Sequence, residues 1–352
     1  MFELSKKTLA ILDDIEHRID TATEEDFQNQ WRDFLYDKFE GDIFIPKRKK
    51  LSQPNAPLPR ININDAINDY DLMMQSQLAI VSRALSKPNE PLCVRANYGT
   101  GILSSLFGTK IFMMPYENNT LPITRSFDDT EKIREILEQG VPDLEAGFGK
   151  KVFEMGEIFK ETFSRYPKIS EYLTVYHPDT QGPLDICELL WGGEMFYAMY
   201  DEPDLVHALL ALVCDTYTAF MNRWNEIFPP RADMNTHWSL FYRGNILIRN
   251  DSAMNLSPAF YDEFSVPYDQ LLLDRFGGGA IHFCGKGDHY IESLSKIKGV
   301  YGINMSQPEY NDMEKIFRAT VDKGIKILSI KRDTAIEHLG RAGAYHHNLN
   351  CT

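Results

Sequence analysis

The 352-residue chain has few cysteines and no pattern that would pair them. Its five cysteines, at positions 93, 187, 214, 284 and 351, include no C-x-x-C pair. An odd set of cysteines spread through a long chain argues against a disulfide framework. We therefore expect free thiols and a cytoplasmic protein.

Basic clusters and long apolar runs are also scarce. Lys and Arg number 37 against 51 Asp and Glu, a net charge of −14, and the longest basic run is KRKK at 47–50. Nucleic-acid binding normally needs a concentrated basic face, so we expect no nucleic-acid partner. No segment approaches the roughly 20 apolar residues of a membrane span, and the N-terminal segment lacks a signal-peptide core. We expect no membrane association.

A dinucleotide-binding signature is missing as well. No G-x-G-x-x-G follows the first predicted strand, and GGG at 277–279 precedes a strand instead of opening a helix. This removes the commonest support for a dinucleotide-binding sheet.

Apolar residues, in contrast, make up 43% of the chain and follow a regular pattern. Residues 1–88 predict an N-terminal helical extension, including a helix from about residue 63 to 85 and a capped helix in TATEEDFQNQWRDFLYDKF. In residues 89–352, short β-branched runs alternate with amphipathic stretches, which predicts an α/β fold with a parallel sheet. The number of units favours a (β/α)8 TIM barrel. The predicted strands are 91–99, 110–115, 172–178, 236–242, 245–251, 279–285, 300–306, 325–330 and 344–351.

The segment AIHFCGKG, residues 280–287, carries the first candidate site. A strand sends alternate side chains to one face, so His282 and Cys284 point the same way at the end of a strand. In a barrel this end is the face where active sites form. Imidazole and thiolate are ligands that zinc prefers, so the pair predicts a zinc site. Two buried core residues and a Cys/His nucleophilic dyad are the other interpretations.

A catalytic zinc ion has three protein ligands and one open position. If AYHHNLNC at 344–351 is the last barrel strand, Cys351 falls at the same rim and supplies the third ligand. His289, five residues after Cys284, is a substitute ligand. A frayed terminal residue is the alternative description of Cys351.

Further polar residues lie near the ends of predicted strands. We expect Asp179 and Asp251 to be catalytic, because a carboxylate at this rim can orient a zinc-binding histidine or contact substrate. Turn or cap formation is the alternative for each of these residues. The predicted substrate-binding residues are Asn97, Tyr98, Gln181 and Asn304.

Two runs carry a resemblance to a known family: HPDTQGPLDICELLWGGEMFYAMYDEPDLVHALL (177–210) and RNDSAMNLSPAFYDEFSVPYDQLLLDRFGGGAIHFCG (249–285). They resemble the uroporphyrinogen decarboxylase superfamily, and HFCG resembles the H-x-C-G of the zinc-dependent methylcobamide:thiol methyltransferases. The resemblance covers about residues 90–351 and implies a (β/α)8 barrel. His282 and Cys284 match the group's first two zinc ligands, and Cys351 best matches the third.

The resemblance also implies a chemistry. Zinc would bind a small thiol and lower its pKa, and the thiolate would attack a methyl group held on the cobalt of a corrinoid. The chain lacks a D-x-H-x-x-G corrinoid loop, so a corrinoid protein is the expected partner. The chain departs from the family pattern in its helical first 90 residues and in stopping one residue after Cys351, which leaves the acceptor open.

Two other functions compete with methyl transfer. A decarboxylase would grip a polycarboxylate with an RQAGR-like loop, but only Arg95 lies on the first predicted strand. A barrel that binds a corrinoid or tetrapyrrole without turnover is the non-enzymatic alternative.

Overall fold

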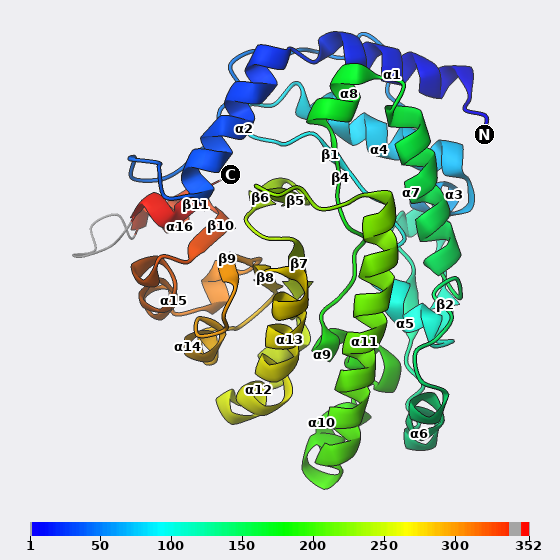
Figure 1. Ribbon diagram of the computed structural model, residues 1–352, viewed down its shortest axis with the longest axis vertical. Coiled ribbons are helices and arrows are strands. Elements are labelled where there is room, and N and C mark those ends of the chain that lie inside the picture. The colour runs from blue at the N-terminus through cyan, green and yellow to red at the C-terminus, as the bar shows by residue number, and fades with distance from the viewer. Residues whose placement is uncertain (1, 338–345, 352) are drawn as a thin grey trace.

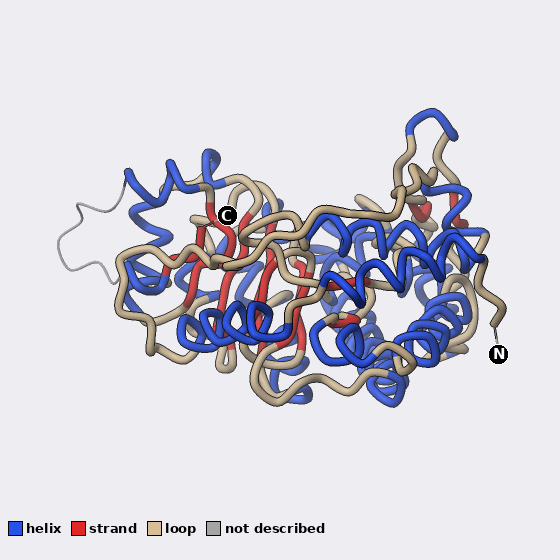
Figure 2. The backbone as a smooth tube through the Cα atoms, turned by 90° about the horizontal axis from the view of Figure 1, so that it is seen from above, coloured by secondary structure: helices blue, strands red, loops and turns tan. Residues whose placement is uncertain are grey.

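The computed structural model describes residues 2–337 and 346–351. The protein has a mixed α/β fold in which a five-stranded parallel sheet is combined with N-terminal helices (Figure 1). The strands of this sheet gather in the half of the molecule that holds the C-terminal end, and the half with the N-terminal end is mostly helical (Figure 2). The α/β class and the N-terminal helices are therefore as predicted.

The N-terminal region contains four helices. They are α1 (Lys6–Arg18), α2 (Thr21–Leu35), α3 (Ile63–Asn68) and α4 (Tyr70–Ala84). The prediction of one helix from about 63 to 85 was wrong, because the chain breaks at Asp69. This residue has extended backbone angles, and its side chain accepts a hydrogen bond from the amide of Leu72, so it caps α4.

The main sheet has the strand order β11-β10-β9-β8-β7, and each neighbouring pair is parallel. Its register places Arg249, His282 and Asn304 side by side on three successive strands. The strands are β7 (Ile246–Arg249), β8 (Gly279–Phe283), β9 (Val300–Met305), β10 (Lys326–Ile330) and β11 (Leu349–Cys351).

The remaining strands form three separate pairs. β1 (Cys93–Val94) and β4 (Thr174–Val175) are parallel, whereas β2 (Lys110–Phe112) with β3 (Ile123–Arg125) and β5 (Asn235–His237) with β6 (Leu240–Tyr242) are antiparallel. The segment after β4 runs next to β7, because the amide of Leu247 donates to His177 Nε2 and the amide of Gly182 donates to the carbonyl of Arg249. Closure of these strands into a (β/α)8 barrel stays a prediction.

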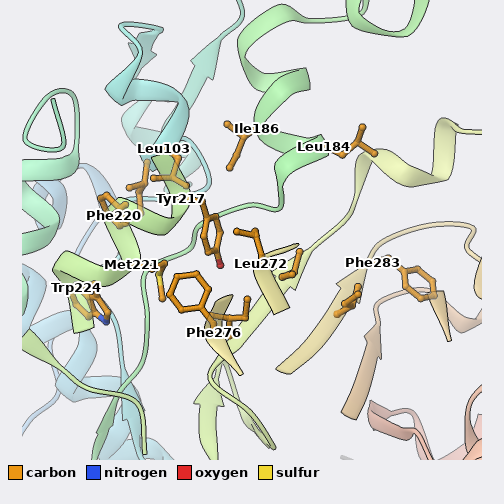
Figure 3. Close-up of a cluster of buried hydrophobic side chains, with 14 of the residues drawn as sticks. Leu103, Leu184, Ile186, Tyr217, Phe220, Met221, Trp224, Leu272, Phe276 and Phe283 are labelled. Atoms are coloured by element: carbon orange, nitrogen blue, oxygen red, sulfur yellow. The ribbon is translucent and has the colours of Figure 1, made fainter. Parts of the chain in front are cut away.

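The other helices surround a large apolar core. Helix α11 packs against α7, α9, α10 and α13, and Figure 3 shows its residues Tyr217, Phe220, Met221 and Trp224 beside Leu272 and Phe276 of α13. By length and composition alone α11 is apolar enough to cross a membrane, and half of that stretch is buried inside the protein. The helices are α5 (Ile102–Leu106), α6 (Thr130–Gln139), α7 (Gly149–Phe163), α8 (Pro167–Tyr172), α9 (Pro183–Trp191), α10 (Glu194–Asp201), α11 (Pro203–Ile227), α12 (Pro258–Phe264), α13 (Val266–Phe276), α14 (Ile291–Leu294), α15 (Met313–Ala319) and α16 (Arg332–Glu337).

The N-terminal segment is attached to the last strand of the sheet. The amide of Phe44 donates to the carbonyl of Leu349, and the amide of Cys351 donates to the carbonyl of Phe44. Phe44 stacks on Phe34 of α2 within an aromatic cluster that also contains Leu328 of the sheet. The predicted domain boundary at residue 88 stays a prediction. Phe44, which precedes that boundary, pairs with the edge strand β11 of the sheet.

Candidate functional site

The candidate site lies at the carboxyl ends of β7, β8 and β9. Asp251 follows β7 by two residues, and Cys284 directly follows β8. His282 lies between Arg249 and Asn304 in the register of the sheet. Because side chains alternate along a strand, His282 and Cys284 share a face, as the sequence predicts.

Asn304 fixes the orientation of the His282 ring. The amide nitrogen of Asn304 donates to the carbonyl of Leu328 at 2.8 Å, which turns its Oδ1 toward His282 Nδ1 at 2.6 Å. Oδ1 can only accept, so Nδ1 carries the hydrogen, and in the neutral ring Nε2 keeps a free lone pair. This is the tautomer that a metal-binding histidine requires when it coordinates through Nε2.

Three potential metal ligands converge at this end of the sheet. His282 Nε2 lies 3.3 Å from Cys284 Sγ and 3.5 Å from Asp251 Oδ1, and all three ligand atoms lie within 4.8 Å of one another. Zinc bond lengths of about 2.0–2.3 Å in a tetrahedral site separate neighbouring ligand atoms by about 3.3–3.6 Å. The observed separations from His282 fit that geometry, and the donor set of imidazole, thiol and carboxylate suits zinc.

The backbone holds the two other members of the group in place. The amide of Cys284 donates to Asp251 Oδ1 at 2.9 Å, so the carboxylate is tied to the end of β8. Gly285 has a φ of +71°, a conformation that favours glycine, and its amide donates to Gln307 Oε1 at 2.6 Å. The glycine turn ends the strand and leaves the Cys284 thiol half-exposed at its rim.

The protonation states at the site disfavour a Cys/His dyad. Burial raises the pKa of the Cys284 thiol to about 11 and lowers the pKa of His282 below its ordinary value, although Asp251 opposes the second shift. At neutral pH the pair is therefore a neutral thiol next to a neutral imidazole, and a nucleophilic dyad needs the thiolate. A bound cation would reverse this preference, because it stabilises the thiolate.

Asp179 is buried at one side of the site in an ion-pair network. Its carboxylate contacts the guanidinium of Arg95 and lies 2.5 Å from Arg249 Nη2. Burial would raise the pKa of Asp179, but the positive charges of Arg249 and Arg95 outweigh it and hold the pKa well below its ordinary value. Asp179 is thus permanently ionised and paired, and its contacts make it a residue that positions Arg249.

A cavity of about 440 Å³ opens over the group. Arg249 forms one wall, with its guanidinium 4.5 Å from the Trp238 ring centroid, and the Trp238 and His282 rings lie 4.7 Å apart. The buried Nε of Arg249 has no hydrogen-bond partner among the described residues. The cavity is lined by Trp238, Ser239, Leu240, Arg249, Asp251, His282, Cys284, Asn304, Met305, Ser306, Pro308, Ser329 and Lys331.

The structure does not bring Cys351 to this group. The register joins Ile281, Ile303, Ile327 and Leu349 in one row, so Leu349 and Cys351 point to the face opposite His282. Cys351 accordingly packs with Ile327 and Leu349 in the apolar core. Asp251, and not Cys351, is the third potential ligand that lies near His282 and Cys284.

The predicted substrate-binding residues have different surroundings. Asn304 lines the cavity, and Gln181 links Arg249 to Asp185 by accepting from Arg249 Nη1 and donating to Asp185 Oδ2. Tyr98 is fully buried and packs against Phe148, and neither Tyr98 nor Asn97 lines this cavity. His289, the substitute ligand, lies outside the group, with Nε2 2.9 Å from the carbonyl oxygen of Leu256.

Sequence reasoning missed Arg249, Trp238 and Asp185. Arg249 and Asp251 are two residues apart in RND, and residues at this spacing in a strand point to the same face. The pattern could therefore have indicated that Arg249 lies beside Asp251 at the rim. The Asp185 carboxylate accepts hydrogen bonds from the amides of Asp251 and Ser252. Its burial and, to a smaller extent, repulsion from the Asp251 carboxylate raise its pKa to about 8. No local pattern singles out Asp185 or Trp238, because both reach the site through contacts between distant segments.

Comparisons of the chain with protein-family models and with curated proteins gave no match.

Proposed function

We propose that Asp251, His282 and Cys284 bind zinc and that the protein is a methyltransferase that moves a methyl group between a corrinoid protein and a small thiol. The observation that carries the proposal is that one potential ligand atom from each of these three residues lies close to the other two. In addition, the contact with Asn304 fixes the tautomer of the His282 ring. We include in the proposal the (β/α)8 barrel, since the site lies at the carboxyl ends of parallel strands, where barrel enzymes place their active sites.

Zinc held by three protein ligands has a fourth position for the acceptor thiol and, as a Lewis acid, would lower the pKa of that thiol. The protein's own residues would orient the acceptor and exclude water. Trp238 and Leu240 form an apolar wall beside the ligand group. Asn304 keeps the His282 ring from rotating, so the ligand set is organised before the substrate arrives.

The charges around the cavity favour an acceptor with an anionic group. Arg95 and Arg249 share the carboxylate of Asp179, and among the charged residues that line the cavity Arg249 and Lys331 exceed Asp251 by one positive charge. One excess charge suits a thiol with a single carboxylate or sulfonate better than the polycarboxylate of a porphyrinogen decarboxylase.

The test is anaerobic methyl transfer from free methylcobalamin to 2-mercaptoethanesulfonate or mercaptoacetate, followed by the absorbance of the cobalamin. The zinc-loaded protein should demethylate the cobalamin and yield one methyl thioether per demethylation. Loss of activity in Cys284→Ser, with the fold retained by circular dichroism, would support the proposal. Full activity of chelator-treated, zinc-free protein would refute it.

Cys187→Ser is a matched control, because Cys187 is a fully buried thiol in the core outside the ligand group. It should keep both zinc and activity. Tetrapyrrole binding that survives loss of His282 and Cys284, without any methyl transfer in the wild type, would instead favour the non-catalytic binding protein.

A further inference from the structure

Backbone strain is concentrated at the cavity over the candidate ligand group. The described residues other than glycine that have a φ in the left-handed region are Asp37, Asn119, Asp128, Trp238 and Ser329. Asp and Asn adopt this conformation readily, whereas a bulky residue with positive φ is an outlier. Trp238, at +49°, and Ser329, at +61°, both line the cavity. Strained residues cluster at binding and active sites, so these two indicate a cavity whose shape matters for function.

Trp238 occupies a turn position that suits glycine. The strands β5 and β6 are joined by Trp238 and Ser239 alone, because His237 pairs with Leu240. Hairpin turns of two residues normally place Gly, Asn or Asp at positive φ. The carbonyl oxygen of Trp238 accepts a hydrogen bond from the Cys93 thiol, with sulfur and oxygen 2.7 Å apart. The structure around the turn therefore holds tryptophan in a conformation that the residue does not favour.

The indole ring of Trp238 is held by two neighbours and stays accessible from the cavity. The guanidinium of Arg249 lies 4.5 Å from its ring centroid, and hydrogen bonds to Asp179 and Gln181 fix that guanidinium. The His282 ring packs edge to face against the indole, with the centroids 4.7 Å apart. Trp238 is only partly buried and lines the cavity. Its ring can therefore contact a molecule that is bound beside His282.

A β-bulge brings Ser329 to the same cavity. Between two pairs of the ladder, β10 advances by three residues, from Ile327 to Ile330, whereas β11 advances by two. The amide of Ser329 donates to Oδ1 of the fully buried Asn350 at 2.9 Å, which fixes the bulge. The strands β6 and β10 contact one another (Figure 1). The cavity is thus bounded by strained backbone from two neighbouring elements.

We propose that Trp238 is a specificity-determining residue that admits a narrow, unbranched thiol to the cavity and excludes thiols that are branched next to the sulfur. The identity of the ligand as a thiol rests on the proposed function. A sulfur bound to zinc at about 2.3 Å would lie beside His282, so substituents on the adjacent carbon would meet the indole. The ring's fixed position makes this wall rigid, because neither Arg249 nor the turn can give way easily.

Mercaptoacetate and 2-mercapto-2-methylpropanoate test the selection, because they share a thiol and a carboxylate and differ by two methyl groups next to the sulfur. With methylcobalamin as donor, zinc-loaded wild type should favour mercaptoacetate in kcat/KM. Trp238→Gly should reduce that preference at least about tenfold, mainly by lowering KM for the branched thiol. The intrinsic reactivities of the thiols cancel in the comparison of the two proteins. Trp238→Tyr retains an aromatic wall and should keep most of the preference. An unchanged preference in Trp238→Gly would overturn the inference.

Binding without methyl transfer separates this inference from the proposed function. Calorimetric titration of the zinc-loaded protein with each thiol should show the same preference, and Trp238→Gly should again reduce it at least about tenfold. Trp238 is the one of the four tryptophans that is not fully buried, so bound thiol should change the fluorescence of the wild type and not that of Trp238→Tyr. Selective binding without methyl transfer would refute the proposed function alone. Equal binding of both thiols to the wild type, or no binding of either, would overturn the inference.

Melting temperatures test the strain itself. Trp238→Gly and Trp238→Ala both remove the ring, but of the two replacements only glycine adopts a φ of +49° without strain. Trp238→Gly should therefore melt at a higher temperature than Trp238→Ala, and Ser329→Gly at a higher temperature than Ser329→Ala. Equal melting temperatures within both pairs would contradict the strain from which the inference starts.

Discussion

Asn304 Oδ1 lies 2.6 Å from His282 Nδ1, and this contact leaves Nε2 of the imidazole facing Cys284 and Asp251. The contact gives a buried strand histidine a defined tautomer. The zinc site that we propose would therefore depend on a residue that does not itself touch the metal.

Replacement of Asn304 tests that dependence. Asn304→Leu removes the acceptor and should lower zinc affinity about 10–100-fold, the usual effect of losing a hydrogen-bond partner of a metal ligand. Asn304→Asp retains an acceptor and should bind zinc nearly as tightly as the wild type. Competition with a chromophoric chelator measures both affinities. Equal affinities in Asn304→Leu and the wild type would show that His282 needs no such support.

The two cysteines near the strand ends should respond differently to substitution. Cys284→Ser should lose zinc, because it removes a ligand, and Cys351→Ser should retain about one zinc per chain, because Cys351 points into the apolar core. Elemental analysis of untagged protein measures the metal directly. Zinc loss in Cys351→Ser with a normal circular-dichroism spectrum would restore Cys351 as the third ligand.

Breaking the Asp179 network should destabilise the protein. Asp179→Asn leaves Arg249 and the largely buried Arg95 without their counter-charge, and removal of one partner from a buried pair costs about 3–5 kcal/mol. Urea unfolding followed by fluorescence measures the loss. Glu202→Gln, which breaks the exposed pair with Arg134, is the control and should leave the midpoint unchanged. Equal midpoints for both variants would contradict the prediction.

Asp269 should make stability depend on pH. Burial raises the pKa of its carboxyl to about 7 from an ordinary value of 3.8, despite hydrogen bonds from Ser265 and Asn250. The folded protein thus holds a proton that the unfolded chain releases between about pH 4 and 7, so this residue's contribution to stability is full below pH 4 and lost as pH rises through 7.

Asp269→Asn should flatten that dependence, because the amide does not ionise. The free energy of unfolding of the wild type, relative to the variant, should fall by on the order of 1–4 kcal/mol from pH 4 to pH 8. Denaturant titrations at both pH values supply the comparison. A wild type that gains stability relative to the variant over this interval would reverse the sign and refute the prediction.

Local patterns were enough to locate part of the site. His282 and Cys284 follow from strand alternation and the glycines after them, and Asp251 was expected at the same rim as a catalytic carboxylate rather than a ligand. The position of these residues at one rim could be predicted because each depends on a few consecutive residues, and their roles stay predictions.

Relationships between strands were harder to predict. The sequence prediction placed Cys351 at the rim without knowledge of the sheet register. The register puts the Cys351 side chain on the face of the sheet opposite His282. The ladder between β10 and β11 also shifts between Ile327 and Ile330, where Ser329 has a φ of +61°. Residues 110–115, expected to form a strand of the barrel, instead contribute to the antiparallel β2–β3 pair. Such outcomes are set by long-range pairing, which single-sequence periodicity does not encode.

The pairing of Phe44 with the last strand has a consequence for synthesis of the protein. Phe44 and Asn350 are 306 positions apart, so the ribosome must add 306 residues after Phe44 before this edge can form. Domains usually fold from the N-terminus as they emerge, but Phe44, which stacks on Phe34 of α2, cannot pair with the last strand until residues 349–351 leave the exit tunnel. We expect nascent chains truncated before β11 to expose Phe34 and Phe44 and to be bound by chaperones that recognise apolar segments.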